Sequence, residues 1–355
     1  MRTAGKSLLQ ALIFLITLEA CIRLGDWFEF NAPLLQSYSL DQLYTVGGDG
    51  MVRGRPFGRY RNWQLNSLGL RGPELAPGTT RILCIGASET FGMLESPGQE
   101  FPRQLQDILN GRNSGRVDVA NLSYFGLRLP TAQLMLPAIH ERVRPTLAVI
   151  YPSFGGYVAR QAQDGGDADL TTSHEVLRLP GRLSDLAKQV IPANIQDWLR
   201  EFFIRRYVKG RALVDHMPAN RAEFLREDLA RLTAELRAEG TEPVLVTHAN
   251  RFNENSDAVD RARYLTAWRR VYPLYTESTL LEMEVQLNGV VRDFARQNDV
   301  LLIDAAAAIT GGPENFTDQV HFTNKGAGLM AELIAARIQP LLGDTQRASP
   351  AATTP

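Results

Sequence analysis

The sequence predicts an α/β domain with a parallel β-sheet whose two faces are covered by helices. Three observations predict it: short apolar runs, amphipathic stretches between them, and a chain of 355 residues with 44% apolar content, long enough to bury a sizeable core. Continuous apolar runs are typical of buried parallel strands. Five such runs alternate with helical stretches, so right-handed crossovers should join them. The predicted strands are 81–86, 117–121, 146–151, 242–248 and 300–304.

The first 25 residues combine a basic start with an apolar run. Arg2 and Lys6 precede the run 8–18, and Glu19 follows it. This pattern is typical of a signal peptide or a signal-anchor, and charged residues near its end disfavour cleavage. The run is shorter than the roughly 20 residues of a full span, and a buried amphipathic helix is the alternative. We expect a membrane anchor over 1–25, which would place the remaining chain in the periplasm.

The rest of the chain divides by composition. Residues 26–78 are rich in Gly, Pro and Arg and predict a connector, and a domain over 79–342 follows. Amphipathic stretches predict helices at 101–110, 131–142, 221–239 and 327–338. A helical insertion at about 158–220 could form a lid, or rest on the membrane or on a partner. The tail 343–355 is rich in Ser, Thr, Pro and Ala and is predicted to be disordered.

Charge and cysteine content exclude several classes of protein. With 38 basic and 39 acidic residues, the net charge of -1 offers no footprint for nucleic acid. Cys21 and Cys84 fall in separate predicted elements, so they imply no disulfide framework. The 5 histidines lack the spacing of metal ligands, and no metal site is predicted.

Ser88 follows the first predicted strand. The run 82–85 ends at Gly86, and the serine stands two residues later. In open α/β sheets, ligands bind outside the carboxyl ends of the strands, so we expect Ser88 at the active edge. A helix beginning there would point free backbone N–H groups at the reacting group. An ordinary strand-to-helix turn is the alternative interpretation.

A candidate base for Ser88 stands just before the last predicted helix. Asp318 precedes His321 by three residues, so in a tight turn its carboxylate can reach the imidazole. It would then fix the tautomer while the histidine takes the serine proton. A serine hydroxyl is a weak nucleophile and needs such a base. A helix-capping turn is the alternative for this pair.

Three further side chains stand near predicted strand ends. His248 could line the site, although a structural role is favoured. Asp304 is expected to cap the turn that follows it. Arg251 could receive an anionic substrate.

Three sequence blocks resemble the SGNH hydrolases, also called GDSL esterases and lipases, and in particular their membrane-anchored bacterial members. The family's Gly-Asp-Ser-x-Thr-x-Gly block corresponds to 86–92, with Ala87 in place of the aspartate. Its strand-end asparagine and loop glycine correspond to Asn121 and Gly126, and its Asp-x-x-His block corresponds to 318–321. The upstream segment 66–72 is also typical of the anchored members.

The resemblance implies a three-layer, flavodoxin-like fold and a site that needs no cofactor. Ser88 would be the nucleophile, His321 the base and then the acid, and Asp318 the group that orients it. The backbone N–H groups of Ser88 and Gly126 would hold the oxyanion. The third family block places an oxyanion-binding asparagine where this sequence has Gly155.

The departure at Gly155 leaves several outcomes open. Loss of one such donor lowers turnover by about 10²–10³-fold. The alignment could slip by a residue or two. Ser153, Tyr157 or Asn250 could supply the donor instead, or the domain could bind without catalysing.

The function implied is a serine esterase that acts through an acyl-enzyme on O-acyl esters, above all O-acetyl esters of carbohydrate or cell-envelope glycan. Transfer of the acyl group to a sugar hydroxyl and lipase action at a membrane are alternatives, because water exclusion and acceptor binding decide between them. A weak or inactive domain that binds glycan or a partner in an envelope assembly is another. The expected partners are thus a small-molecule or glycan ester, the membrane, and envelope proteins.

Overall fold

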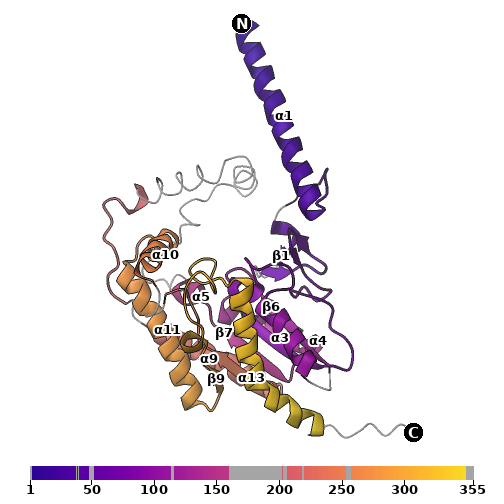
Figure 1. The fold of residues 1–355 in the computed structure, drawn as a ribbon, viewed down its shortest axis with the longest axis vertical. Helices are drawn as coiled ribbons and strands as arrows, with labels where there is room; N and C mark the ends of the chain where they lie inside the picture. Colours follow the sequence, from indigo (N-terminus) through magenta and orange to yellow (C-terminus); the bar gives the residue numbers. More distant parts are fainter. Residues whose placement is uncertain are drawn as a thin grey trace, which may run out of the picture. The chain divides into compact units, whose positions relative to one another are not determined.

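The computed structural model describes residues 2–36, 38, 40–47, 52–112, 116–159, 202, 206–217, 220–252 and 257–348 (Figure 1). The chain forms two compact units. The first comprises Met1–Gly69 and Thr172–Gly210, and the second comprises Leu70–Thr171 and Arg211–Pro355.

A five-stranded sheet forms the centre of the second unit. Its strands are β5 (Thr80–Gly86), β6 (Val117–Ser123), β7 (Leu147–Tyr151), β8 (Glu242–Val246) and β9 (Leu301–Ile303). Their order is β6-β5-β7-β8-β9, and all neighbours are parallel. This is the 2-1-3-4-5 order of flavodoxin-like sheets. The predicted fold class and all five predicted strands are confirmed, with ends that differ by one or two residues.

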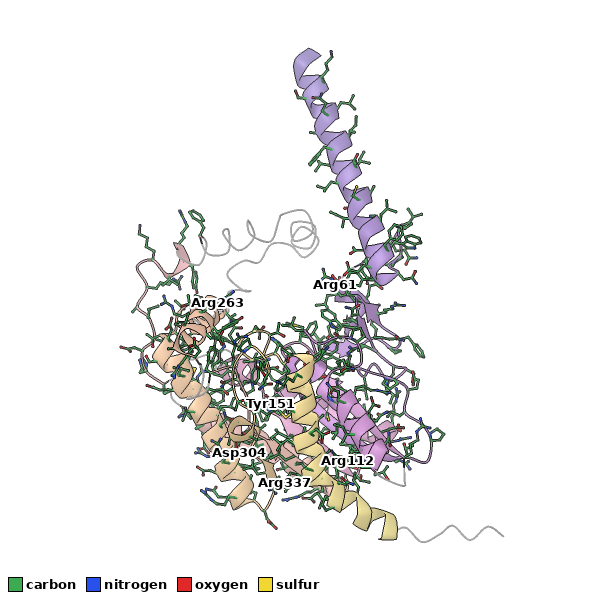
Figure 2. The ribbon with its side chains drawn as sticks, in the orientation of Figure 1. Arg61, Arg112, Tyr151, Arg263, Asp304 and Arg337 are labelled. Carbon is green, nitrogen blue, oxygen red and sulfur yellow. The ribbon has the colours of Figure 1, made fainter. Side chains whose placement is uncertain are left out.

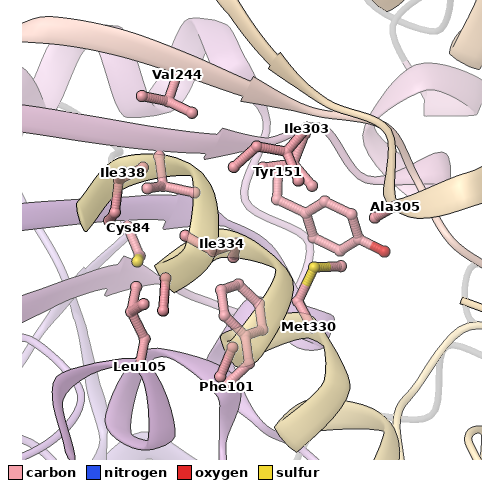
Figure 3. Close-up of a cluster of buried hydrophobic side chains, with 14 of the residues drawn as sticks. Cys84, Phe101, Leu105, Tyr151, Val244, Ile303, Ala305, Met330, Ile334 and Ile338 are labelled. Carbon is pink, nitrogen blue, oxygen red and sulfur yellow. The ribbon is translucent and has the colours of Figure 1, made fainter. Parts of the chain in front are cut away.

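Helices cover both faces because successive strand side chains point to opposite sides. Ile82, Cys84 and Tyr151 pack in one cluster with residues of α3 (Phe101–Arg112) and α13 (Asn324–Ala348) (Figure 3). The other face is covered by α4 (Leu129–Val143), α9 (Arg221–Ala238) and α11 (Glu277–Gln297). The four predicted helices correspond to α3, α4, α9 and α13.

Four more helices of this unit matter for the site or its surroundings. They are α2 (Ser88–Phe91), α5 (Phe154–Ala159), α10 (Ala258–Val271) and α12 (Ala305–Ala308). Helices α10 and α11, between β8 and β9, are not among the predicted elements.

The first unit contains α1 (Arg2–Phe30), a short 3-10 helix (Leu40–Gln42) and two small antiparallel pairs. The pairs are β1 (Tyr44–Val46) with β2 (Val52–Gly54), and β3 (Arg59–Tyr60) with β4 (Trp63–Gln64). The predicted connector therefore carries regular structure between its turns.

The prediction of an N-terminal membrane anchor is wrong. Helix α1 has 29 residues, but none of the helices in the described ranges is both long and apolar enough to cross a membrane. The apolar run ends at Glu19, whose carboxylate pairs with the Nε of Arg23 at 2.7 Å. The predicted periplasmic location depended on the anchor and loses that support with it.

Two other predicted segments lie largely outside the described residues. Most of the insertion 158–220 falls in 160–201 and in the gaps after it, so its role stays a prediction. The tail was expected from 343, but α13 continues to Ala348. Alanine and leucine near its end favour helix, which accounts for the later boundary.

Candidate active site

Ser88 lies at the carboxyl edge of the sheet, where the strand order reverses. Strand β5 ends at Gly86, which is in register with Ser123 of β6 and Tyr151 of β7, and α2 begins at Ser88. A Cβ atom on Gly86 would lie 2.0 Å from Oγ1 of Thr90, so this turn requires glycine. The reversal between β5 and β7 is the point at which flavodoxin-like sheets bind ligands.

The structure brings Ser88, His321 and Asp318 together. The Nε2 atom of His321 lies 2.9 Å from Oγ of Ser88, and its Nδ1 lies 2.8 Å from Oδ2 of Asp318. Asp318 also accepts the backbone N–H groups of Val320, at 3.0 Å, and of His321, at 2.9 Å. These bonds fix the carboxylate in a tight turn. The arrangement can move a proton from the serine to the imidazole while the carboxylate orients the ring.

Electrostatics adjust both members of the His321–Asp318 pair. Burial alone would raise the pKa of Asp318, but its hydrogen bonds and the charge of His321 hold that pKa below its usual range. Burial opposes protonation of His321, yet the hydrogen bond and charge of Asp318, and then the charge of Glu89, raise the pKa of the imidazole above its ordinary value. The ring is therefore a stronger base than a free histidine.

A second histidine–carboxylate cluster lies directly beside Ser88. The Oε2 atom of Glu89 lies 3.2 Å from Oγ of Ser88, and its Oε1 lies 3.4 Å from Nε2 of His248. The Nδ1 atom of His248 lies 2.6 Å from Oε1 of Glu284 on α11. His248 has no exposed surface, and both glutamates are buried. The Tyr151 ring stacks on His248, with centroids 5.4 Å apart.

The charges of this cluster follow from its contacts. Burial alone would lower the pKa of His248, but the charges and hydrogen bonds of Glu284 and Glu89 raise it to about 10. Burial alone would raise the pKa of Glu89, but the hydrogen bond and charge of His248 keep it below its usual range. His248 is thus a buried cation between two carboxylates.

Sequence reasoning favoured a structural or peripheral role for His248 and missed both glutamates. One signal for Glu284 existed. It stands on the apolar stripe of α11, in line with Leu280 and Leu287, where a charged side chain needs a buried partner.

The predicted oxyanion-binding glycines lie in the segments that follow β6 and β7. Gly126 has a φ of 71°, a conformation that favours glycine, in a turn where the Leu127 N–H bonds to the Tyr124 carbonyl. Gly155 lies in α5, and a Cβ atom there would lie 3.4 Å from the hydroxyl of Tyr272. A glycine at this position offers no side-chain donor.

The three side chains considered as replacements have contacts of their own. Asn250 Oδ1 accepts the Phe252 N–H at 2.7 Å, and the hydroxyl of Tyr157 bonds to Gln286. Ser153 Oγ accepts the Gly156 N–H at 3.1 Å. A hydroxyl that accepts one bond can still donate its own hydrogen, so Ser153 remains able to act as a donor.

Ser153 also lines a small cavity of about 30 Å³ at the carboxyl ends of β5 and β7. Gly86, Tyr151 and Gly156 contribute to its wall, together with residues of α4 and α9.

Other predicted residues have structural contacts. Asn121 donates from Nδ2 to the Thr90 carbonyl at 3.0 Å and thereby ties β6 to α2. Asp304 caps α12, as predicted, and pairs with Arg292 (Figure 2). Arg251, considered as a receiver of an anionic substrate, is buried and already pairs with a carboxylate of the chain, since its Nη2 lies 2.6 Å from Oδ1 of Asp260.

Metal ligation was also considered. Within the described part of the chain, no group of three or more His, Cys, Asp or Glu side chains is arranged to hold a metal ion.

Comparisons with known proteins find similarity only among solved structures. No family model and no curated protein matches the chain. A GDSL-like lipase from Bacteroides thetaiotaomicron is 13% identical, with a TM-score of 0.42, covering 76% of this chain and 93% of the other. A psychrotrophic esterase from Pseudoalteromonas is 13% identical, with a TM-score of 0.43, covering 74% and 99%. An acetyl-xylooligosaccharide esterase from Geobacillus is 14% identical, with a TM-score of 0.42, covering 74% and 96%. The chain is thus similar to solved structures that include a GDSL-like lipase, the type that its blocks at 86–92 and 318–321 resemble.

Proposed function

We propose that this protein is a serine ester hydrolase of the SGNH type. One observation carries the proposal: His321 contacts Oγ of Ser88 with one ring nitrogen, at 2.9 Å, and Asp318 with the other, at 2.8 Å. A chain of hydrogen bonds therefore joins the nucleophile to the base and the base to the orienting carboxylate. Acyl transfer by serine requires this geometry.

The reaction proceeds in two steps. Nε2 of His321 takes the Ser88 proton as Oγ attacks the ester carbonyl carbon, and the backbone N–H groups of Ser88 and Gly126 stabilise the oxyanion. When the C–O bond breaks, His321 gives the proton to the leaving alkoxide and an alcohol departs. A water then attacks the acyl-serine with His321 as base, which releases the carboxylic acid and restores Ser88.

The substrate class that we propose is an O-acyl ester of carbohydrate, with acetyl as the acyl group. The resemblance of the sequence blocks supports this choice. The test of this substrate class is a comparison of initial rates on three substrates: p-nitrophenyl acetate, a long-chain p-nitrophenyl ester and an acetylated polysaccharide. Release of acetate from the polysaccharide, with little activity on the long-chain ester, is the expected result. Preference for the long chain would favour a lipase.

A weakly active or inactive domain that binds a glycan is the second candidate, and Gly155 favours it. Labelling by a fluorophosphonate reagent separates the two functions, because the reagent forms a covalent bond only with an activated serine. We expect labelling of the wild-type chain and none of Ser88→Ala, with Ser96→Ala as the matched control. Absence of labelling in the wild type, where a known esterase is labelled, would exclude the hydrolase.

A further inference from the structure

The Ser88 hydroxyl has two proton acceptors and one proton. His321 Nε2 lies 2.9 Å from Oγ, and Glu89 Oε2 lies 3.2 Å from it. When His321 is neutral, the hydroxyl can donate to Nε2, which is the arrangement ready for attack. When His321 is protonated, its Nε2–H donates to Oγ, and the hydroxyl hydrogen can turn to Glu89.

Glu89 can fill this place only as a carboxylate, because a protonated carboxyl would compete as a donor. A carboxylate this deeply buried ordinarily takes up a proton. Here His248 Nε2 lies 3.4 Å from its other oxygen, and Glu284 anchors the opposite nitrogen of that ring at 2.6 Å. Asn288 holds the same segment, since its Oδ1 accepts the His248 backbone N–H at 2.7 Å.

We propose that Glu89 is a positioning residue for Ser88 and His321, and that the buried His248–Glu284 pair keeps its carboxylate charged beside the nucleophile. The proposal rests on the proposed function, since it assigns Glu89 a part in the same reaction. The Glu89 charge stabilises the imidazolium that forms when His321 takes the serine proton, in addition to Asp318. Glu89 is thereby a second carboxylate that stabilises the base. It acts on the Nε2 side of the His321 ring, where Ser88 lies, whereas Asp318 acts on the Nδ1 side.

Other titratable groups face this site, and none substitutes for Glu89. The groups that surround Glu89 and His321 are Glu95, Asp318, His248, Glu284, Tyr151 and Tyr272. Burial raises the pKa of Glu95 to about 8, so this carboxyl is largely neutral at pH 7. Burial also raises the pKa of both tyrosines, which stay uncharged. Among the described residues, Asp318 and Glu89 are therefore the carboxylates that bring negative charge to His321 and to its contact Ser88 at neutral pH.

The test is the titration of His321 by NMR in full-length protein labelled at histidine, with the resonance assigned through His321→Gln. Three variants are compared with the wild type: Glu89→Gln, His248→Gln and the control His140→Gln. His140 is also a histidine beside a glutamate, 3.5 Å from Glu239, but it lies on α4. Glu89→Gln keeps the shape of the side chain, removes its charge and replaces one acceptor oxygen by an NH2 donor.

We expect the pKa of His321 to fall by about one pH unit in Glu89→Gln, because an adjacent opposite charge typically shifts a pKa by 1–3. His248→Gln should give a similar fall, because Glu89 becomes protonated without its cation. His140→Gln should leave the titration unchanged. In an active enzyme, the acid limb of kcat/KM should move down by the same amount in Glu89→Gln, with kcat lowered about tenfold.

An unchanged His321 titration in folded Glu89→Gln would overturn the proposal. Thermal unfolding shows whether His248→Gln folds. If it does not fold, the His321 titration in Glu89→Gln still tests the proposal. The titration needs no turnover. An inactive wild type would therefore refute the proposed function without changing what the titration shows about Glu89. A loss of activity in Glu89→Gln with an unchanged titration would show a structural role only and would also overturn the proposal.

Discussion

Two histidine–carboxylate pairs flank the same serine, and they differ in what the second ring nitrogen meets. In His321–Asp318 the contact is 2.8 Å, the histidine side chain is 12% exposed, and Nε2 faces a hydroxyl. In His248–Glu284 the contact is 2.6 Å, the histidine is fully buried, and Nε2 faces a second carboxylate. The first pair can gain and lose a proton during a reaction. The second is held as a permanent cation.

The difference shows that a histidine–carboxylate pair does not by itself make a base. One carboxylate, Asp318, contacts His321 directly and leaves it able to titrate, whereas two carboxylates contact His248 and raise its pKa to about 10. A general base works best when its pKa lies near the operating pH. His321 is therefore the candidate base, and His248 is a fixed charge.

Replacing the candidate base should have the largest effect on turnover. We expect His321→Gln to lower kcat/KM by about 10⁴-fold, because loss of a triad member removes activation of the nucleophile. The measurement is the initial rate on p-nitrophenyl acetate. His140→Gln is the control, and thermal unfolding should be almost unchanged in both variants. Retention of more than a tenth of the wild-type rate would mean that His321 is not the base.

Replacing the buried histidine should affect stability most. We expect His248→Gln to lower the free energy of unfolding by about 3–5 kcal/mol, because two buried carboxylates lose their shared cation. Urea unfolding at pH 6.5 measures this. If His248→Gln lowered the free energy of unfolding no more than His321→Gln does, His248 would not be the buried structural cation that distinguishes the two pairs.

The pH dependence of stability gives a second readout for His248. A folded-state pKa raised above the unfolded value stabilises the fold fully below the unfolded pKa of about 6.5. That contribution is lost as the pH rises from there through about 10. The wild type should therefore lose stability across this window, and His248→Gln should lose less. If stability declined equally in both proteins, groups other than His248 would cause the decline.

The same contrast explains what the sequence could predict. Ser88 and the Asp318–His321 turn were predictable because each is a local signal at the end of a strand or before a helix. The contact of Glu89 with His248 joins residues 159 positions apart. No local pattern carries such a contact, and a glutamate after the nucleophile looks like a solvent-facing residue of a first helical turn.

The fold followed from the sequence for a similar reason. Continuous apolar runs such as 82–85 indicate buried parallel strands wherever they occur. The anchor was a wrong prediction because a basic start and an apolar run were given more weight than Glu19. That carboxylate, paired with Arg23, ends the apolar stretch of α1.

A further test concerns the oxyanion, for which Gly155 offers no side-chain donor and Ser153 is a candidate replacement. If the Ser153 hydroxyl donates to the oxyanion, Ser153→Ala should lower kcat by about 10–100-fold with little change in KM. Ser123→Ala, a buried serine on β6, is the matched control. An unchanged kcat would show that the Ser153 hydroxyl does not donate to the oxyanion.

Glu95 is a buried carboxyl that pairs with no cation among the described residues, so replacing it should raise stability, and only at high pH. Its Oε2 accepts the Leu94 N–H at 3.1 Å, and burial raises its pKa to about 8. A raised folded-state pKa means that its stabilising contribution is full below about 4.5 and is lost as the pH rises through 8. Glu95→Gln should therefore raise the free energy of unfolding at pH 9, by up to about 5 kcal/mol, and change little at pH 5. Urea unfolding of both proteins at the two pH values tests this. An equal change in the free energy of unfolding at pH 5 and pH 9 would show that Glu95 stays ionised. It would then behave as Glu89 does, but without a partner such as His248.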